Sequence, residues 1–224
     1  MKKIVTTFFI LFVAKIGFAQ AYLISVKAKG YTKGLTYFTY YNGSNLNIQD
    51  SGIIKKDGSI TFAGKTKLLG GIYVLVLPDR RRVDFLIDKE QKITIKLDSA
   101  DLVYKTVITG SKENIVYQQY QKTVTTKGRL RDAEGKAYLA STTKADSILH
   151  ENKYNAYSNE MSVYRESIVK NQPESMMASL LLAMKETPVL MQNPKTREDS
   201  AANLYYYKKH FWDGITFMDD RLIR

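Results

Sequence analysis

The segment LLGGIYVLVLPDRRRVDFLIDKEQKITIKL, residues 68–97, specifies local structure more clearly than any other part of the chain. Its run IYVLVL at residues 72–77 is short and apolar and stops at Pro78. A run of this kind, bounded by Gly and Pro, is typical of a strand that is buried on both faces. The charged residues 79–82 that follow suit a turn.

Two further runs come after that turn. Residues 83–88 alternate between apolar and polar side chains, except at Leu86, and residues 92–97 alternate throughout. This period of two gives a sheet one dry face and one wet face, and Asp84 and Asp88 fall on the wet one. We therefore predict three antiparallel strands in succession within residues 68–97.

Other segments between residues 20 and 110 have the same character. Each is short, contains β-branched or aromatic residues, and ends near a turn signal such as Asn42-Gly43. They lie at residues 22–29, 35–41, 46–54, 59–63 and 102–109. About eight short strands at this spacing predict an antiparallel β-sandwich or barrel, and the sequence leaves open which of the two forms.

The pattern changes after Gly110. Ser111 can cap a helix, and Glu113 places a negative charge in its first turn, where it is favourable. Apolar residues then recur at helical spacing as far as residue 210. The expected helices lie at residues 112–152, with 125–132 as a candidate interruption, and at 154–170, 176–184 and 195–210. The predicted fold class is α+β, with an antiparallel β-domain at 20–110 followed by a mainly α-helical region at 111–210.

The first nineteen residues have the features of a signal peptide. A basic start at Lys2 and Lys3 precedes an apolar run at residues 4–14, which is too short to span a bilayer comfortably. Small residues at Gly17 and Ala19 occupy the positions that a signal peptidase reads. We therefore expect cleavage after Ala19, export to the periplasm or cell envelope, and no stable membrane span in the mature chain.

The charge and the missing cysteines exclude some functions. The formal net charge is +12, and loss of Lys2, Lys3 and Lys15 with the signal peptide would leave +9. Export and the spread of the basic residues argue against a nucleic-acid partner. Because the chain has no Cys, it has no disulfide, no thiol catalysis and no thiolate metal site within these residues.

Neither histidine has the neighbours that a metal site needs. His150 has Asp146 at helical spacing, and His210 has Asp213. One His and one Asp are fewer than the three protein ligands of a catalytic metal centre, so we predict structural or surface roles for both. The pattern predicts no metal, no cofactor and no catalytic residue within the chain.

Neither the paired acids nor any known catalytic motif indicates an active site in the sequence. Asp219-Asp220 followed by Arg221 indicates a turn or a helix start with a local ion pair. A carboxylate pair does acid–base chemistry only when one member is desolvated. The chain contains no nucleophile elbow, P-loop or dinucleotide-binding glycine motif.

Two groups of residues are candidates for a binding surface. Tyr37 and Tyr41 lie in the aromatic strand LTYFTYY and could form a stacking face. Arg80, Arg81 and Arg82 form a basic triplet that could contact an anionic surface or ligand. The interpretation that we favour for the triplet is a solvated loop tip.

Two apolar clusters in the helical region allow two interpretations. The run MMASLLLAM at residues 176–184 and the triplet Tyr205-Tyr206-Tyr207 could line a binding groove. Runs of this type are more often core and helix–helix contact, which is the interpretation we favour.

The last residues contain apolar side chains that need a partner surface. Trp212, Ile215, Phe217 and Met218 lie in the ending FWDGITFMDDRLIR. We expect these four residues to dock on another domain. Residues 211–224 are then the start of a connection to a C-terminal domain that is missing from this chain.

Four blocks of the chain together resemble a known family. They are the signal peptide ending FAQ, the block LLGGIYVLVLPDRRRVDFLIDKEQ, the helix start GSKENIVYQQYQK and the ending YYYKKHFWDGITFMDDRLIR. Together they look like the N-terminal region of exported thioredoxin-like proteins of Bacteroidetes. The resemblance implies a β-rich domain of unknown function, then a helical segment, then a thioredoxin fold of the disulfide-reductase type. It implies that the active dithiol would lie beyond Arg224, so no catalytic residue transfers to this chain.

Three hypotheses about function follow. The first is a non-catalytic accessory region of a periplasmic thioredoxin-like protein that binds clients or partners, positions domains, or helps form a homodimer. The second is a stand-alone exported binding module for a glycan, a peptide or a cell-surface component. The third, an enzyme that acts through Asp or His, has the weakest support from the residues.

Overall fold

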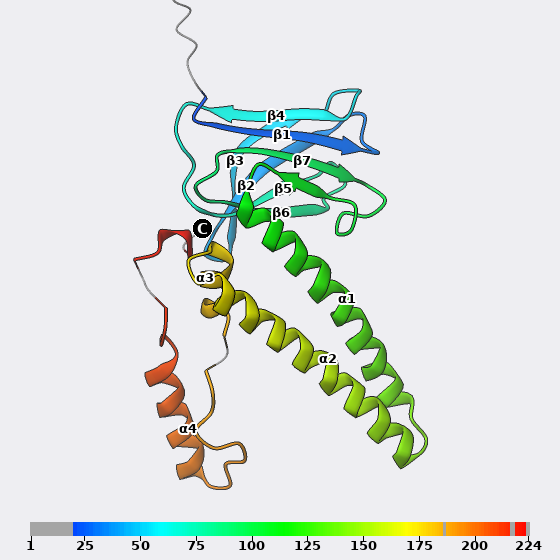
Figure 1. Ribbon diagram of the computed structural model, residues 1–224, viewed down its shortest axis with the longest axis vertical. Coiled ribbons are helices and arrows are strands. Elements are labelled where there is room, and N and C mark those ends of the chain that lie inside the picture. The colour runs from blue at the N-terminus through cyan, green and yellow to red at the C-terminus, as the bar shows by residue number, and fades with distance from the viewer. Residues whose placement is uncertain (1–19, 186, 216–217, 223–224) are drawn as a thin grey trace, which may run out of the picture.

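The computed structural model describes residues 20–185, 187–215 and 218–222. Eight strands are followed by four α-helices and a short 3-10 helix, η1, in an α+β arrangement, which confirms the predicted fold class (Figure 1). The predicted signal peptide and Phe217 lie outside the described residues. The strands are β1 (Tyr22–Lys29), β2 (Leu35–Asn42), β3 (Asn45–Ile53), β4 (Ser59–Gly64), β5 (Gly71–Val76), β6 (Arg82–Ile87), β7 (Lys92–Asp98) and β8 (Val107–Thr109).

The strands form two separate four-stranded sheets, so the β-domain is a sandwich. One sheet has the order β4-β1-β7-β8 and the other has the order β3-β2-β5-β6. The expectation of three successive antiparallel strands is wrong at its third member. β5 pairs with β6, but β7 crosses to the other sheet and pairs in parallel with β1. Alternation places the apolar residues of β7 inward in either sheet, so its pattern could not identify the partner strand.

Aromatic rings form the centre of the core between the sheets. Phe38 of β2 is fully buried, and its ring centroid lies 5.3 Å from that of Tyr73 and 5.4 Å from that of Phe62. Phe38 and Tyr73 belong to one sheet and Phe62 to the other. Side chains from the inner faces of both sheets therefore interdigitate to form the core.

The outer face of the sheet that contains β5 and β6 is also partly buried. Tyr73, Val74 and Leu75 are all fully buried, which confirms that β5 is covered on both faces. Leu86, on the outer face of β6, is fully buried as well. The expectation that Asp84 lies on a wet face is wrong, because the start of the first helix packs against β6 and removes water from this side.

The first helix, α1 (Lys112–Ala140), closes one side of the sandwich through two amide side chains. Asn114 Oδ1 accepts a hydrogen bond from the Leu86 N–H at 2.8 Å, and Asn114 Nδ2 donates to the Leu86 carbonyl at 2.6 Å. One turn later, Gln118 accepts from Ile108 N–H at 2.9 Å and donates to the Thr106 carbonyl at 2.7 Å. Since β6 is an edge strand of one sheet and β8 an edge strand of the other, these amides occupy positions where a further strand could pair.

The chain between β7 and α1 contains less strand than expected. The predicted strand at 102–109 is shortened to β8, because Asp101 Oδ1 accepts hydrogen bonds from the N–H groups of Val103 and Tyr104. This arrangement is a turn stabilised by the Asp side chain. Ser111 then caps α1 as expected, and its side chain accepts from the N–H of Asn114.

Two long helices form a hairpin that projects from the sandwich (Figure 1). α1 and α2 (Lys144–Asn171) are joined by residues 141–143, so the candidate interruption at 125–132 is wrong, and the second helix begins ten residues before its predicted start. The cause is the sequence Ser141-Thr142-Thr143, in which Ser141 ends α1 and the Thr143 side chain caps α2. Tyr120 and Tyr164 stack across the hairpin with centroids 6.4 Å apart.

The remaining helices lie close to their predicted positions. α3 (Met176–Ala183) packs at the base of the hairpin, and α4 (Arg197–His210) lies apart from the sandwich (Figure 1). η1 (Asp220–Leu222) follows α4 and returns to the junction of sandwich and hairpin. No helix in the described ranges combines the length and the apolarity that crossing a membrane requires.

Candidate functional site

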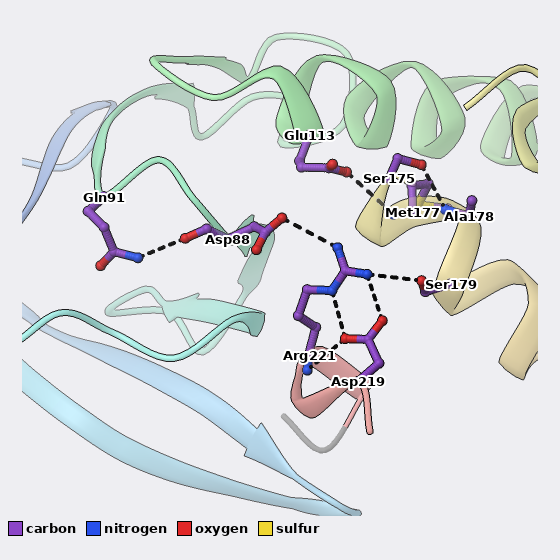
Figure 2. A network of polar contacts seen from close by, with 9 residues as sticks. All are labelled: Asp88, Gln91, Glu113, Ser175, Met177, Ala178, Ser179, Asp219 and Arg221. Atoms are coloured by element: carbon purple, nitrogen blue, oxygen red, sulfur yellow. Dashed lines mark hydrogen bonds and ion pairs between the residues drawn. The ribbon is translucent and has the colours of Figure 1, made fainter. Parts of the chain in front are cut away.

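The junction between sandwich, hairpin and C-terminal segment holds a network of charged groups around Arg221 (Figure 2). The Arg221 guanidinium binds the Asp219 carboxylate in a two-pronged contact, with Nε at 2.7 Å and Nη2 at 2.6 Å. Nη2 also donates to Ser179 Oγ of α3 at 3.2 Å, and Nη1 lies 3.5 Å from Asp88 Oδ2 at the end of β6. The local ion pair predicted for this stretch is therefore confirmed, and it extends to two distant elements.

Neighbouring contacts fix the positions of the groups that Arg221 binds. Gln91 Nε2 donates to the Asp88 carbonyl at 2.8 Å, and Ser175 caps α3 through the N–H of Ala178 (Figure 2). Glu113, in the first turn of α1, accepts from the N–H of Met177 at 3.4 Å. The first turns of α1 and α3 therefore meet beside the Arg221 network.

The electrostatics of this network suit docking better than catalysis. The hydrogen bonds from Arg221 hold the pKa of the Asp219 carboxyl below its usual range, and the same contacts raise the pKa of the guanidinium. Both groups are mostly buried. A carboxylate that is paired in this way stays ionised and is a poor proton donor. The Arg221 stem also packs at Gly70, where an added Cβ would lie 2.7 Å from Arg221 Cγ.

The arginine triplet is divided among three environments. Arg80 occupies the turn between β5 and β6 at φ 68° and is exposed. Arg81 donates to Asp79 at 2.8 Å, to the Ser99 carbonyl at 2.6 Å and to the Tyr31 hydroxyl at 2.9 Å. Arg81 therefore joins three loops of the sandwich, and its guanidinium has contacts that a simple solvated loop tip would lack.

Arg82 lies on the same sheet face as the two candidate tyrosines. The strand register places Tyr37 opposite Val76, and Val76 opposite Arg82, in one row across β2, β5 and β6. Tyr41 lies four residues further along β2, about 13 Å from Tyr37 at ordinary strand spacing. Both tyrosines are half-buried. The fold thus brings Tyr37, Tyr41 and Arg82 to one outer face, while Arg80 and Arg81 stay at the turn.

Asp84 is a buried acid that the sequence pattern placed in water. Desolvation raises the pKa of its carboxyl, and its buried Oδ1 atom has no hydrogen-bond partner among the described residues. The nearby Tyr117 of α1 also has a raised pKa, first because of its own burial and then because of the charge on Asp84. A buried carboxylate without a donor destabilises the fold when it ionises.

Three of the four residues expected to dock on another domain, Trp212, Ile215 and Met218, lie within the described ranges. Trp212 is 53% exposed and Met218 is 92% exposed, whereas Ile215 is half-buried. Trp212 contacts the ring of Phe211 edge-on at 4.5 Å.

Each histidine ring lies within hydrogen-bonding distance of a carboxylate in the helical region. His150 Nδ1 lies 2.6 Å from Glu134 Oε2 on the facing helix α1, and His210 Nδ1 lies 2.6 Å from Asp213 Oδ2. The sequence placed Asp146 beside His150, but Glu134 is the acid that the hairpin brings to its ring. Within residues 20–185, 187–215 and 218–222, no three His, Asp or Glu side chains lie close enough together to hold a metal ion.

A groove of about 530 Å³ lies between α2 and α3. Its lining includes Leu182 and Met184, from the apolar run that had two interpretations in the sequence. Met176, Met177, Ala178 and Leu181 of the same run are buried. The run is therefore core on one side, as favoured, and lines a groove on the other.

Comparison with known proteins identifies the β-sandwich segment only. Residues 22–117 match the model of a family described as a domain of unknown function (DUF4369). This part covers all eight strands and the start of α1. The structure of Klebsiella pneumoniae 5-hydroxyisourate hydrolase shows 16% sequence identity over 42% of this chain and 95% of that chain, with a TM-score of 0.25. No curated protein matches this chain.

Proposed function

We propose that the chain is a non-catalytic accessory region of an exported thioredoxin-like protein of the periplasm or cell envelope. In this proposal the sandwich and the helices bind clients or partners, position a thioredoxin-like domain, or form a homodimer. Two observations support it. The sequence blocks described above resemble such proteins, and residues 22–117 match a domain of unknown function, as that resemblance implies.

The main structural support for the proposal is that Arg221 attaches η1 to the sandwich and to α3. Asp88 and Ser179, from two distant parts of the chain, bind the guanidinium that the neighbouring Asp219 also holds. Hydrogen bonds to charged groups contribute about 1.5–3 kcal/mol each when they are well formed. A domain attached next to η1 would therefore be held at a fixed place on the sandwich, whereas a flexible linker would leave its orientation free.

The coding sequence downstream of Arg224 gives the first test. The proposal expects a Trp-Cys-x-x-Cys motif within roughly two hundred residues, which is the size of one further domain. A stop codon without such a motif would contradict it.

Arg221→Gln tests the docking itself in the full-length protein. We expect this change to release η1, which small-angle scattering would detect as a larger radius of gyration and limited proteolysis as faster cleavage after α4. Arg197→Gln, an exposed change at the start of α4, is the matched control. Equal scattering and cleavage for the two variants would remove the structural support for the proposal.

A stand-alone binding module for a glycan, peptide or cell-surface component is the second candidate. The half-buried Tyr37 and Tyr41, which share one sheet face with Arg82, favour it. Exchange of both tyrosines for Ala should abolish binding to a glycan or peptide array and leave the melting temperature nearly unchanged, with Tyr138→Ala on α1 as control. If the double variant unfolds, the tyrosines belong to the core.

A further inference from the structure

The groove between α2 and α3 has an apolar floor. Val169 of α2 and Leu181, Leu182 and Met184 of the α3 segment line it. Its volume of about 530 Å³ falls within the range of roughly 300–1,000 Å³ that is usual for small-molecule sites. Met184 is 70% exposed at this floor, and a methionine adapts its shape to irregular apolar ligands.

The sequence of α3 explains why the groove exists. The run MMASLLLAM is apolar around almost the whole helix, and a helix of that kind needs cover on every side. One side packs against the hairpin, where Met177 and Leu181 meet Ile168 of α2 and Tyr117 of α1. The sandwich and hairpin leave the side of Leu182 and Met184 incompletely covered.

The rim of the groove is predominantly basic. Among the described residues, Arg165, Lys170 and Lys185 line it together with one acid, Glu166, and all four side chains are exposed. The Arg165 Nε–H donates to the neutral Tyr120 hydroxyl at 3.3 Å, and no ion pair to Arg165 occurs within the part of the chain that the structure describes. The rim therefore favours an anion, while the floor favours a hydrocarbon.

We propose that this groove binds an amphiphile with a hydrocarbon chain and an anionic head group, such as a long-chain carboxylate. The chain lies on Val169, Leu182 and Met184, and burying each methylene is favourable by the hydrophobic effect. The carboxylate meets the lysine and arginine side chains of the rim, where charge-assisted hydrogen bonds are available. A cationic amphiphile of the same length would gain the floor contacts but would be repelled by the rim.

Isothermal titration calorimetry below the micelle concentration tests this proposal with two probes of equal chain length, dodecanoate and dodecyltrimethylammonium. We expect dodecanoate to bind at least about tenfold more tightly. Lys170→Gln combined with Lys185→Gln should weaken dodecanoate binding about 3- to 10-fold, the range expected for two exposed charges. Lys144→Gln combined with Lys153→Gln removes the same charge from α2 away from the groove and should leave dodecanoate binding unchanged.

A second pair of variants tests the floor. Leu182→Asn and Met184→Asn should each weaken the binding of dodecanoate, while far-ultraviolet circular dichroism confirms an unchanged helix content. Several results would overturn the proposal: no binding of dodecanoate, equal binding of both probes, or an equal loss in the control variant. A dimer in sedimentation velocity that Met184→Glu dissociates would also overturn it, since a second copy of the chain would then occupy the groove.

Discussion

Replacement of Asn114 by Leu should destabilise the protein far more than its position on a polar helix suggests. The Asn114 amide is fully buried and makes reciprocal hydrogen bonds with the N–H and carbonyl of Leu86, at 2.8 and 2.6 Å. Leu has the same branched arrangement of heavy atoms but no polar atoms, so both backbone groups of Leu86 would remain buried without partners. Each such group costs about 1–3 kcal/mol, which gives a loss of about 2–6 kcal/mol in the free energy of unfolding.

Urea unfolding followed by circular dichroism measures this loss. With a slope of about 2 kcal/mol per molar urea, a loss of 4 kcal/mol lowers the midpoint by about 2 M. Gln118→Leu should cost less, because the Gln118 side chain is only half-buried, whereas Asn114 is fully buried. Asn155→Leu, at an exposed position of α2, is the control. An Asn114→Leu variant within about 0.5 kcal/mol of wild type would refute the role of Asn114 in sealing β6.

Two further substitutions test the β-domain. Asp84→Asn should stabilise the protein at pH 7, because burial raises the pKa of Asp84. With a raised pKa, the folded state loses stability as pH rises from about 3.9, the ordinary pKa of Asp. The gain in stability should therefore shrink at pH 3, and a gain independent of pH would contradict the burial of the charged carboxylate. Gly110→Ala should lower the free energy of unfolding, measured by thermal unfolding, by at least about 2 kcal/mol. The reason is that Gly110 has φ 89° and an added Cβ would lie 2.3 Å from the Lys92 carbonyl oxygen. A loss below about 1 kcal/mol would show that the backbone between β8 and α1 relaxes freely.

The sequence placed the strands well because β-structure has a strong local signal. Alternation, aromatic and β-branched residues, and turn dipeptides located all eight strands, although β8 is much shorter than predicted. The partner of β7 was missed for a physical reason: pairing is a long-range property, and Ile93, Ile95 and Leu97 face inward in either sheet.

The boundary between the two helices of the hairpin carries a clear local signal. Residues 125–132 contain no helix stop, and their Gly128 is accommodated within α1 with open space around it. The true boundary lies at Ser141-Thr142-Thr143, where a hydroxyl side chain caps the following helix. Capping residues are therefore a better guide to this boundary than the composition of the flanking segments.

The Arg221 network could be predicted only in its local half. Asp219 and Arg221 are two residues apart, so their pairing follows from the sequence. Asp88 and Ser179 lie far away along the chain, and no periodicity in either segment points to a cation. Only the fold, which brings the end of β6 next to α3, makes them partners.

The burial of Asp84 was signalled by Leu86. In VDFLID, residues 83–88, strict alternation would put a polar side chain at position 86, yet the residue there is Leu. A leucine among acids on a supposedly wet face indicates that something covers that face, and α1 does so, with Asn114 bound to the backbone of Leu86. The packing of α1 that excludes water from Leu86 also excludes it from Asp84, which lies two residues earlier on the same face of β6. A single break in alternation therefore predicts both a packed helix and a destabilised carboxylate, and the pH dependence of Asp84→Asn tests that inference directly.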